Sequence, residues 1–357
     1  MNRLVLSLLL LLSVNSFSLA QSQKSSSSTS IQQAHANNSN GNYYQNPVFD
    51  HDFPDPNLVR SPDGYFYAYS TNTNWRKEGL EGPYTTPVLR SKDLVHWVFV
   101  GDAFDKKPDW KKGGIWAPDV TYYKHKYILF FAFSTWGDPN PAIGVAVSQK
   151  PEGPFTDLGK LFYSKEIGVD NSIDANLVID HGKPYLVWGS FRGIYGIALS
   201  DDATKIAGKK FQIAGNQFEG SYIYKRGKYF YYFGSSGSCC EGVKSTYHLR
   251  VGRSVSLKGP YVDKDGKSLL GGGGTLVLKA DEGDKGFVGP GHNGDIETDD
   301  AGQTWMVYHA IYKTGSKPEN AGAGRPMLLD KIEWIDGWPV FHGQQPSDTL
   351  QPGPVFR

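Results

Sequence analysis

The sequence predicts an all-β fold, a five-bladed β-propeller, and three observations support this prediction. A turn followed by a strand rich in aromatic residues occurs five times along the chain. Each copy follows an apolar strand that begins beside an acidic or polar residue, and each is followed by a further strand. No long stretch has the periodicity of an amphipathic helix. Repeats of three or four short strands, at intervals of roughly 40 to 50 residues or somewhat more, are typical of blades around a central channel.

The segment 1–20 has the features of a secretory signal peptide. Arg3 precedes an apolar run from Leu4 to Val14 that is too short to span a bilayer. The segment ends at Ala20 with small residues at the positions that signal peptidase recognises, and no Cys follows that could anchor a lipoprotein. We therefore expect an exported protein without a membrane span, located in the periplasm or outside the cell.

The rest of the chain divides into a leader and one domain. Residues 21–42 are rich in Ser, Gln and Asn and nearly free of apolar side chains, so we predict a disordered leader or linker. Residues 43–357 show no further change of composition and are expected to form a single catalytic propeller domain. The formal net charge is +1 and the basic residues are dispersed, which argues against nucleic acid or an anionic membrane as a partner. We expect a monomer.

The aromatic and cysteine contents narrow the class of protein further. Aromatic residues make up 14% of the chain, and in an exported β-rich protein their rings can serve both the core and the binding of sugars. The two cysteines, Cys239 and Cys240, are adjacent, which excludes a disulfide framework. A disulfide between them, two thiols, or a linkage between molecules all remain open. We assign the pair to the local structure of a loop near the functional site.

The strands of the five copies can be placed from the sequence. The aromatic strands are expected at residues 65–69, 127–133, 185–188, 229–233 and 305–309. Each follows a turn rich in Gly, Lys, Asp or His, which predicts a hairpin. A third strand is expected at residues 87–91, 143–148, 194–200, 249–254 and 325–329.

The innermost strand of each blade should start at the same end of the channel, so the residues just before it should converge. These residues are Asp55, Asp119, Asp174, Glu219 and the segment 292–295. Any one such carboxylate could simply satisfy main-chain groups at a turn. Several of them in one opening, with Trp116 beside them, favour chemistry instead. Like charges raise one another's pKa, so one carboxyl group can stay protonated while another stays ionised, as glycoside hydrolysis requires.

Ordered motifs along the whole domain carry a resemblance to a known family. The motifs are Pro54-Asp55-Pro56, Trp116-Ala117-Pro118-Asp119, Ile173-Asp174-Ala175-Asn176, Glu219-Gly220-Ser221 and Gly291-His292-Asn293. In this order they resemble glycoside hydrolase family 43, which comprises five-bladed propeller arabinanases, arabinofuranosidases and xylosidases. The resemblance implies an inverting glycoside hydrolase acting on a polysaccharide or oligosaccharide.

The resemblance also implies roles for individual residues. Asp55 matches the general base, Glu219 matches the general acid, and Asp174 matches the carboxylate that raises the pKa of the acid and orients it. Inversion requires the acid and the base to stand roughly 6.5–9.5 Å apart, which leaves room for a water molecule. His292 matches a channel histidine that helps to hold a hydrated metal ion, often calcium. The residues expected to bind substrate are Trp116, Asp119, Asn176, Ser221 and Arg325.

The substrate prediction is α-1,5-linked arabinan, cleaved within the chain. The segments 239–247, 324–326 and 334–339 are similar to the arabinanase branch of the family. Endo-arabinanases usually have His directly before the Asp-Pro of the base motif, whereas this chain has Pro54. An exo-acting arabinofuranosidase or a β-xylosidase of the same family therefore remains an alternative.

Two alternative functions lie outside this family. A retaining, levansucrase-like propeller would need an Arg-Asp-Pro motif in the middle of the chain and a Glu-Cys pair, and the sequence has neither. A non-catalytic glycan-binding propeller would use the aromatic residues to bind sugar and would not need all three carboxylates. The presence of Asp55, Asp174 and Glu219 together argues against it.

Overall fold

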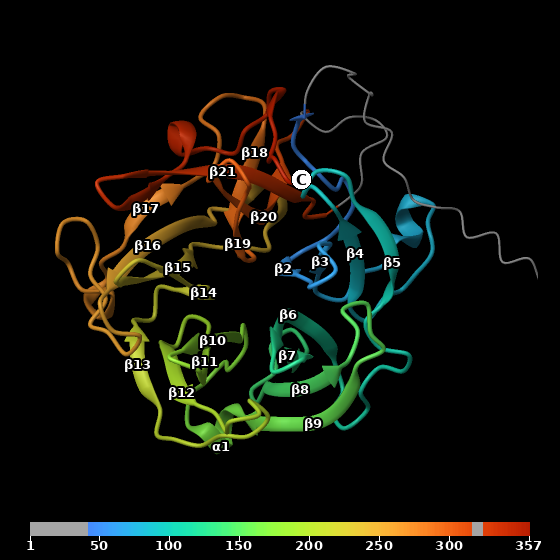
Figure 1. The fold of residues 1–357 in the computed structure, drawn as a ribbon, viewed down its shortest axis with the longest axis vertical. Helices are drawn as coiled ribbons and strands as arrows, with labels where there is room; N and C mark the ends of the chain where they lie inside the picture. Colours follow the sequence, from blue (N-terminus) through green and yellow to red (C-terminus); the bar gives the residue numbers. More distant parts are fainter. Residues whose placement is uncertain (1–41, 316–323) are drawn as a thin grey trace, which may run out of the picture. The chain divides into compact units, whose positions relative to one another are not determined.

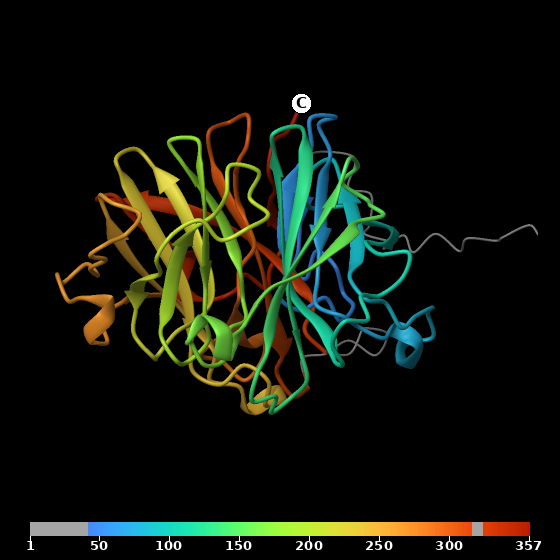
Figure 2. The same cartoon turned by 90° about the horizontal axis from the view of Figure 1, so that it is seen from below.

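The computed structural model describes residues 42–315 and 324–357, which form five antiparallel sheets arranged as the blades of a propeller (Figure 1). The predicted signal peptide and all of the predicted leader except Asn42 lie outside the described residues. Viewed from the side, the strands run between the two faces of the propeller (Figure 2). No helix among the described residues is long and apolar enough to cross a membrane.

Each of the first four blades is a sheet whose strands pair in chain order. Blade 1 holds β2 (Asn57–Arg60), β3 (Phe66–Tyr69), β4 (Pro87–Ser91) and β5 (Val98–Asp102). Blade 2 holds β6 (Gly114–Tyr123), β7 (Lys126–Ser134), β8 (Ala142–Ser148) and β9 (Thr156–Tyr163). Blade 3 holds β10 (Asn176–Asp180), β11 (Lys183–Trp188), β12 (Ile194–Ala198) and β13 (Phe211–Ala214). Blade 4 holds β14 (Glu219–Arg226), β15 (Tyr229–Ser236), β16 (His248–Ser254) and β17 (Thr275–Leu278).

Blade 5 has a divided inner edge. Both β18 (Phe287–Gly291) and β19 (Ile296–Thr298) pair with β20 (Thr304–Tyr312), which is followed by β21 (Met327–Ile335) and β22 (Trp338–Val340). The remaining elements are β1 (Tyr43–Tyr44), β23 (Gln351–Pro352), α1 (Ser164–Ile167) and the 3₁₀ turns η1 (Trp75–Glu78), η2 (Gly242–Lys244), η3 (Leu269–Gly271) and η4 (His342–Gln344).

The prediction of an all-β, five-bladed propeller is confirmed. The five predicted aromatic strands correspond to β3, β7, β11, β15 and β20. The predicted third strands correspond to β4, β8, β12, β16 and β21, although β12 ends two residues earlier than predicted and β21 extends to Ile335. The strand expected from Arg325 begins at Met327, because the N–H of Arg325 is bound by the carboxylate of Asp52 and Pro326 has no N–H to donate to a sheet.

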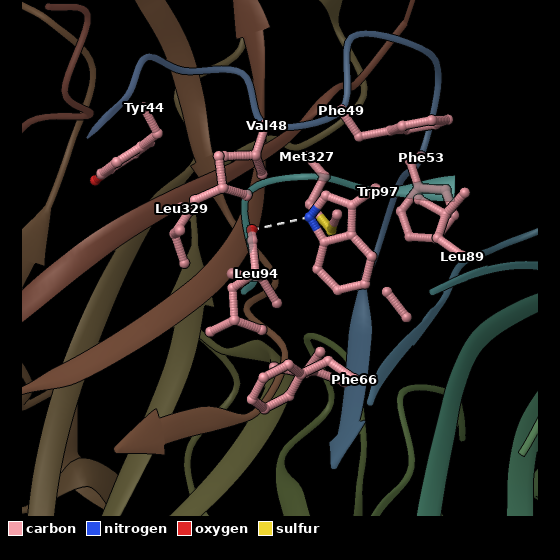
Figure 3. Packing of buried hydrophobic residues seen from close by; sticks show 14 of the residues in the cluster. Tyr44, Val48, Phe49, Phe53, Phe66, Leu89, Leu94, Trp97, Met327 and Leu329 are labelled. Carbon is pink, nitrogen blue, oxygen red and sulfur yellow. Dashed lines mark hydrogen bonds between the residues drawn. The ribbon is translucent and has the colours of Figure 1, made fainter. Parts of the chain in front are cut away.

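The hydrophobic core is divided among the interfaces between neighbouring blades. Period-2 alternation gives each strand two opposite faces, and both faces of a blade meet another blade. Between blades 1 and 5, for example, Phe66 and Leu89 share a buried cluster with Leu329 (Figure 3). The N-terminal segment extends this cluster, since Phe49 and Phe53 are fully buried in it. Stacked in this way, the blades provide a rigid frame for loops at the ends of the channel.

The chain ends close the ring between blades 1 and 5. Strand β1 pairs with β23, and Phe49 and Met327 form an isolated antiparallel bridge. Because Phe49 precedes blade 1 and Met327 belongs to β21, this bridge connects the start of the domain to its last blade.

Near the channel, a ring of side-chain hydrogen bonds joins each blade to the next. In each blade, a side chain in the inner strand or directly before it accepts a hydrogen bond from a main-chain N–H of the following blade. The pairs, acceptor first, are Asn57 and Val120 (2.8 Å), Asp119 and Leu177 (2.9 Å), Asn176 and Ile223 (3.0 Å), Tyr222 and Ile296 (3.1 Å), and Asp295 and Leu58 (3.2 Å). We call these five acceptors the inter-blade ring. It fixes the relative position of the residues directly before each inner strand.

Candidate active site

A pocket of about 890 Å³ opens where the inner strands begin. Residues from all five blades line it, among them Asp55, Trp116, Asp174, Glu219, His292 and Arg325. The predicted convergence of the three carboxylates and Trp116 at one opening is therefore present in the structure. The channel end where they meet is the candidate active site.

A repeated backbone conformation turns side chains into this pocket. In blades 1 to 4, the residue two positions before the member of the inter-blade ring has a backbone in the left-handed region. These residues are Asp55 (φ 54°), Ala117 (φ 43°), Asp174 (φ 58°) and Gly220 (φ 57°). This conformation is uncommon for residues with a side chain, except Asn, Asp and His. In blade 4 the position is glycine, because a Cβ on Gly220 would lie 3.0 Å from Cγ of His292.

Asp55 is buried in a setting that favours its ionised form. Nη1 of Arg325 donates to Oδ1 of Asp55 at 2.9 Å, and the hydroxyl of Thr71 donates to Oδ2 at 2.6 Å. Nδ1 of His292 lies 3.3 Å from Oδ1. Burial by itself would raise the pKa of Asp55, but the charge of Arg325, with His292 and Thr71, holds this pKa well below its usual range. Asp55 is therefore held as an ionised carboxylate.

His309 supports the backbone of Asp55 as a neutral ring. The main-chain N–H of Asp55 donates to Nδ1 of His309 at 3.0 Å, so Nδ1 is an acceptor and the ring proton is on Nε2. Burial lowers the pKa of His309 well below its usual value, which agrees with a neutral ring. The ring lies parallel to Tyr247, with centroids 5.9 Å apart. His309 therefore positions Asp55 through the main chain.

Glu219 and Asp174 occupy a setting that favours the protonated form. Burial raises the pKa of Glu219 above its usual value, although a hydrogen bond from Ser190, whose Oγ is 2.7 Å from Oε2, works in the opposite direction. Burial and then the charge of Glu219 raise the pKa of Asp174. Oδ2 of Asp174 also accepts the main-chain N–H of Gly220 at 3.0 Å, which ties it to the residue after Glu219. The environments thus shift the pKa of Glu219 and that of Asp55 in opposite directions.

The five residues predicted to bind substrate separate into two groups. Trp116 and Arg325 line the pocket. Asp119 and Asn176 belong to the inter-blade ring, where Nδ2 of Asn176 also donates to Oδ1 of Asp119 at 2.9 Å. Ser221 has its hydroxyl 3.2 Å from that of Tyr232. None of these last three is among the pocket-lining residues.

Sequence reasoning did not identify Trp136 as a pocket residue. It lines the pocket and its relative exposure is 82%, which is unusual for so large an apolar side chain. The available signal was a tryptophan within the polar, turn-forming stretch 135–140. An exposed indole beside buried carboxylates provides a flat surface for a sugar ring.

The two cysteines form a disulfide in the pocket wall. Of the three states left open by the sequence, the structure has the bond between Cys239 and Cys240. The loop from β15 to β16 carries it, and both residues line the pocket together with Glu241. The base of this loop is held by hydrogen bonds of Ser238 with Ser245 and Thr246.

The side chains around His292 provide few ligands for a metal ion. Calcium takes six to eight oxygen ligands, and no group of three or more His, Cys, Asp or Glu side chains suited to a metal occurs in the described part of the chain. Nδ1 of His292 faces Asp55, whose Oδ1 is already bound by Arg325. These side chains do not by themselves form a calcium site, so a metal at His292 would depend mainly on water ligands.

Comparisons with known proteins agree with this fold and pocket. The model of "Glycosyl hydrolases family 43" matches residues 44–339. An extracellular exo-α-(1→5)-L-arabinofuranosidase of Cellvibrio japonicus is 34% identical over 320 residues, covering 81% of this chain and 86% of the relative. An extracellular endo-α-(1→5)-L-arabinanase of Bacillus subtilis is 32% identical over 306 residues, covering 80% of this chain and 87% of the relative.

Solved structures show the same similarity. An α-L-arabinanase of Cellvibrio cellulosa, complexed with arabinohexaose, has a TM-score of 0.70 and 30% identity, covering 82% of this chain and 96% of that chain. An endo-arabinanase of Bacillus licheniformis has a TM-score of 0.68 and 28% identity, covering 83% of this chain and 99% of that chain.

Proposed function

Because this chain belongs to family 43 of the glycosyl hydrolases and is a glycoside hydrolase, we propose that it cleaves α-1,5-L-arabinofuranosidic bonds of arabinan with inversion. The observation that carries the proposal is the contrast between two carboxyl groups in one pocket. Asp55 is held ionised, whereas the surroundings of Glu219 favour its protonated form. An inverting glycosidase needs such a pair, one group on each side of the bond that breaks.

Asp55 acts as the general base in this proposal. A water molecule beside Asp55 attacks the anomeric carbon and loses a proton to the carboxylate as the new C–O bond forms. Arg325 and Thr71 each hold one oxygen of Asp55, so the carboxylate has a fixed orientation before substrate arrives. Such preorganisation avoids reorientation in the transition state.

Glu219 acts as the general acid. It gives a proton to the departing glycosidic oxygen while the old C–O bond breaks, and it ends the step ionised. Asp174, bound to the N–H of Gly220, orients the segment that carries the acid, and repulsion between the two carboxylates opposes the ionisation of both groups together. After the reaction Asp55 is protonated and Glu219 is ionised, and exchange with solvent restores both.

The choice of arabinan is supported by the relatives named above, two of which are enzymes for α-(1→5)-L-arabinan linkages. We propose cleavage within the polymer, as in the B. subtilis relative. The exposed Trp136 supports this mode, because an apolar platform at the pocket rim can hold sugar units beyond the one that is cleaved. Exo action, as in the C. japonicus relative, is the second candidate.

Three further expectations accompany this function. Since two relatives are extracellular, we propose that the segment 1–20 directs export. We propose that the enzyme acts as a monomer, since residues of a single chain supply all the carboxyl groups that the reaction needs. Calcium at His292 remains a prediction, and no step above depends on it.

The test is a product time course on linear arabinan, branched arabinan and xylo-oligosaccharides. A ladder of arabino-oligosaccharides at early times is expected for endo cleavage, whereas arabinose or xylose alone from the first minutes would establish an exo enzyme. Proton NMR of the first product should show the inverted anomer. Glu219→Gln and Asp55→Asn should each fold and lose about 100-fold or more of the activity on arabinan. Normal activity in either variant would refute its assigned role.

A further inference from the structure

Ser190 lies in the loop between β11 and β12, against the segments that carry two of the carboxyl groups. The N–H of the residue before it donates to the carbonyl of Ile173, and the N–H of the residue after it donates to the carbonyl of Phe218, each at 2.9 Å. Ile173 directly precedes Asp174, and Phe218 directly precedes Glu219. The relative exposure of Ser190 is 1%. The loop therefore holds this hydroxyl in one place between the two acidic segments.

The direction of the hydrogen bonds at Ser190 can be assigned from chemistry. Nδ2 of Asn171 lies 3.1 Å from the carbonyl oxygen of Ser190 and 2.9 Å from its Oγ. A carbonyl oxygen can only accept, so the NH₂ group of Asn171 must face Ser190. Because Oγ then accepts from Asn171, its own hydrogen is free to point at Oε2 of Glu219, 2.7 Å away.

This direction distinguishes the two oxygens of Glu219. Oε2 receives a hydrogen from Ser190, whereas no described residue makes a hydrogen bond to Oε1. The hydroxyl of Tyr247 lies near this carboxyl group and also lowers its pKa, but it has no hydrogen-bond partner among the described residues. A carboxylic acid carries one proton, and the oxygen that already accepts a hydrogen bond is the less favourable place for it. We propose that Asn171 and Ser190 form a positioning pair that keeps the acid proton of Glu219 on Oε1 and directs it toward the glycosidic oxygen. This inference rests on the proposed role of Glu219 as the general acid.

The pair should also favour the transition state. As the C–O bond breaks, the proton moves from Oε1 to the leaving oxygen and negative charge develops on Glu219. The hydrogen bond from Ser190 to Oε2 then becomes charge-assisted and stronger, while Ser190 keeps its own hydrogen. Asn171 contributes by preventing rotation of that hydroxyl. Neither residue exchanges a proton, so both are positioning residues.

The experiment compares two substrates that differ in their need for an acid. An α-1,5-arabino-oligosaccharide has a sugar alkoxide leaving group, which requires protonation. A 4-nitrophenyl glycoside of the same sugar releases a phenolate that departs without it. Loss of acid catalysis should therefore lower kcat/KM on the oligosaccharide and spare the aryl glycoside, whereas general damage to the pocket should affect both.

Three variants of the purified enzyme test the pair. Ser190→Ala removes the donor and should lower kcat/KM on the oligosaccharide by about 10- to 100-fold, but by less than about 3-fold on the aryl glycoside. Asn171→Asp places an acceptor where the NH₂ group was, which draws the hydroxyl of Ser190 away from Glu219, and should give the same selective loss. Ser190→Thr keeps the hydroxyl and should restore most of the activity.

Ser148→Ala is the matched control. Ser148 is also buried, at 8% exposure, but it pairs with Tyr127 at the opposite end of its blade, and its Oγ accepts the N–H of Lys150 at 3.1 Å. This variant should leave both substrates within about twofold of the parent enzyme. Thermal unfolding of each variant would identify a folding defect.

The outcomes separate this inference from the function on which it rests. Glu219→Ala should itself show the selective loss, and an equal loss on both substrates would refute the role of Glu219 as the acid. If Glu219→Ala loses kcat/KM on the oligosaccharide alone while Ser190→Ala and Asn171→Asp do not, that result would support Glu219 as the acid and refute the positioning pair. Equal losses on both substrates in the two pair variants would mean that they only support the fold.

Discussion

Arg325 and Asp55 lie 270 residues apart in the sequence, yet Nη1 of Arg325 is 2.9 Å from Oδ1 of Asp55. The pairing crosses the point where the ring of blades closes, since Asp55 precedes the first inner strand and Arg325 precedes β21 of the last blade. The environment of Asp55, the proposed base, therefore depends on closure of the ring. The pairing also explains why a buried carboxylate remains ionised, because the neighbouring guanidinium compensates for the loss of water.

Replacing Arg325 should therefore change the pH dependence of the enzyme. Asp55 works as a base only when ionised, and Arg325 keeps its pKa well below the usual range. In Arg325→Met the pKa of Asp55 rises, so the carboxylate becomes protonated at a higher pH. The acid limb of the kcat/KM profile should move to higher pH.

The matched control for this measurement is Arg192→Met. Arg192 is exposed and its guanidinium donates to the carbonyl of Phe191, so its removal changes the net charge equally without touching Asp55. The acid limb of the kcat/KM profile of Arg192→Met should coincide with that of the parent enzyme. A uniform loss of activity in Arg325→Met, with no movement of the limb, would contradict the electrostatic role of Arg325.

Asn176→Ala should lower stability more than substrate binding. The side chain of Asn176 accepts the N–H of Ile223 and donates to Asp119 between blades 2, 3 and 4. Its removal leaves a buried N–H and a buried carboxylate with fewer partners, which costs about 1–3 kcal/mol of unfolding free energy. Denaturant unfolding and KM on arabinan check this prediction, with the exposed Asn216→Ala as control. A large rise in KM at unchanged stability would support the predicted role in substrate binding.

Reduction of the disulfide should weaken substrate binding. Cys239 and Cys240 are the only cysteines of the chain, so any effect of dithiothreitol on the protein must act through them. Opening the bond gives the pocket-lining loop more conformations, and KM on arabinan should rise while the melting temperature changes little. A double variant with serine at both positions should not respond to dithiothreitol. An unchanged KM of the reduced parent enzyme would mean that this part of the wall does not contact substrate.

Removal of metal tests the prediction for His292. If a hydrated calcium ion binds there, EDTA should lower activity or melting temperature, and added calcium should restore it. His292→Ala should reproduce the effect and abolish the response to EDTA. No change in either quantity, in either experiment, would remove the metal from the description of this enzyme.

The sequence by itself determined the number of blades and the approximate position of their strands. It could do so because alternation and turn chemistry are local, and because the pattern repeats five times. It also placed Asp55, Asp174 and Glu219 before inner strands. In a propeller this position implies the channel end, so their convergence in the pocket followed from the fold class.

Only the tertiary structure decided how residues at similar positions differ in environment. The sequence also predicts Asp119 just before an inner strand, yet Asp119 lies within β6, faces the next blade and accepts the N–H of Leu177 in place of lining the pocket. The difference comes from an irregularity of the backbone, since the strand pairing shifts between Trp116 and Asp119 and Ala117 between them is in the left-handed region. This interrupts the regular alternation of side chains, so Trp116 lines the pocket while Asp119 faces the next blade.

The exposure of Trp136 and the hydrogen bonds of Ser190 likewise depend on long-range geometry. Ser190 meets Glu219 because two loops from neighbouring blades touch, and no local pattern encodes that contact. Local periodicity therefore fixed the blades and the positions of the acids. The packing of blade against blade decided which carboxyl group is held ionised, which has surroundings that favour its protonated form, and which joins the blades together.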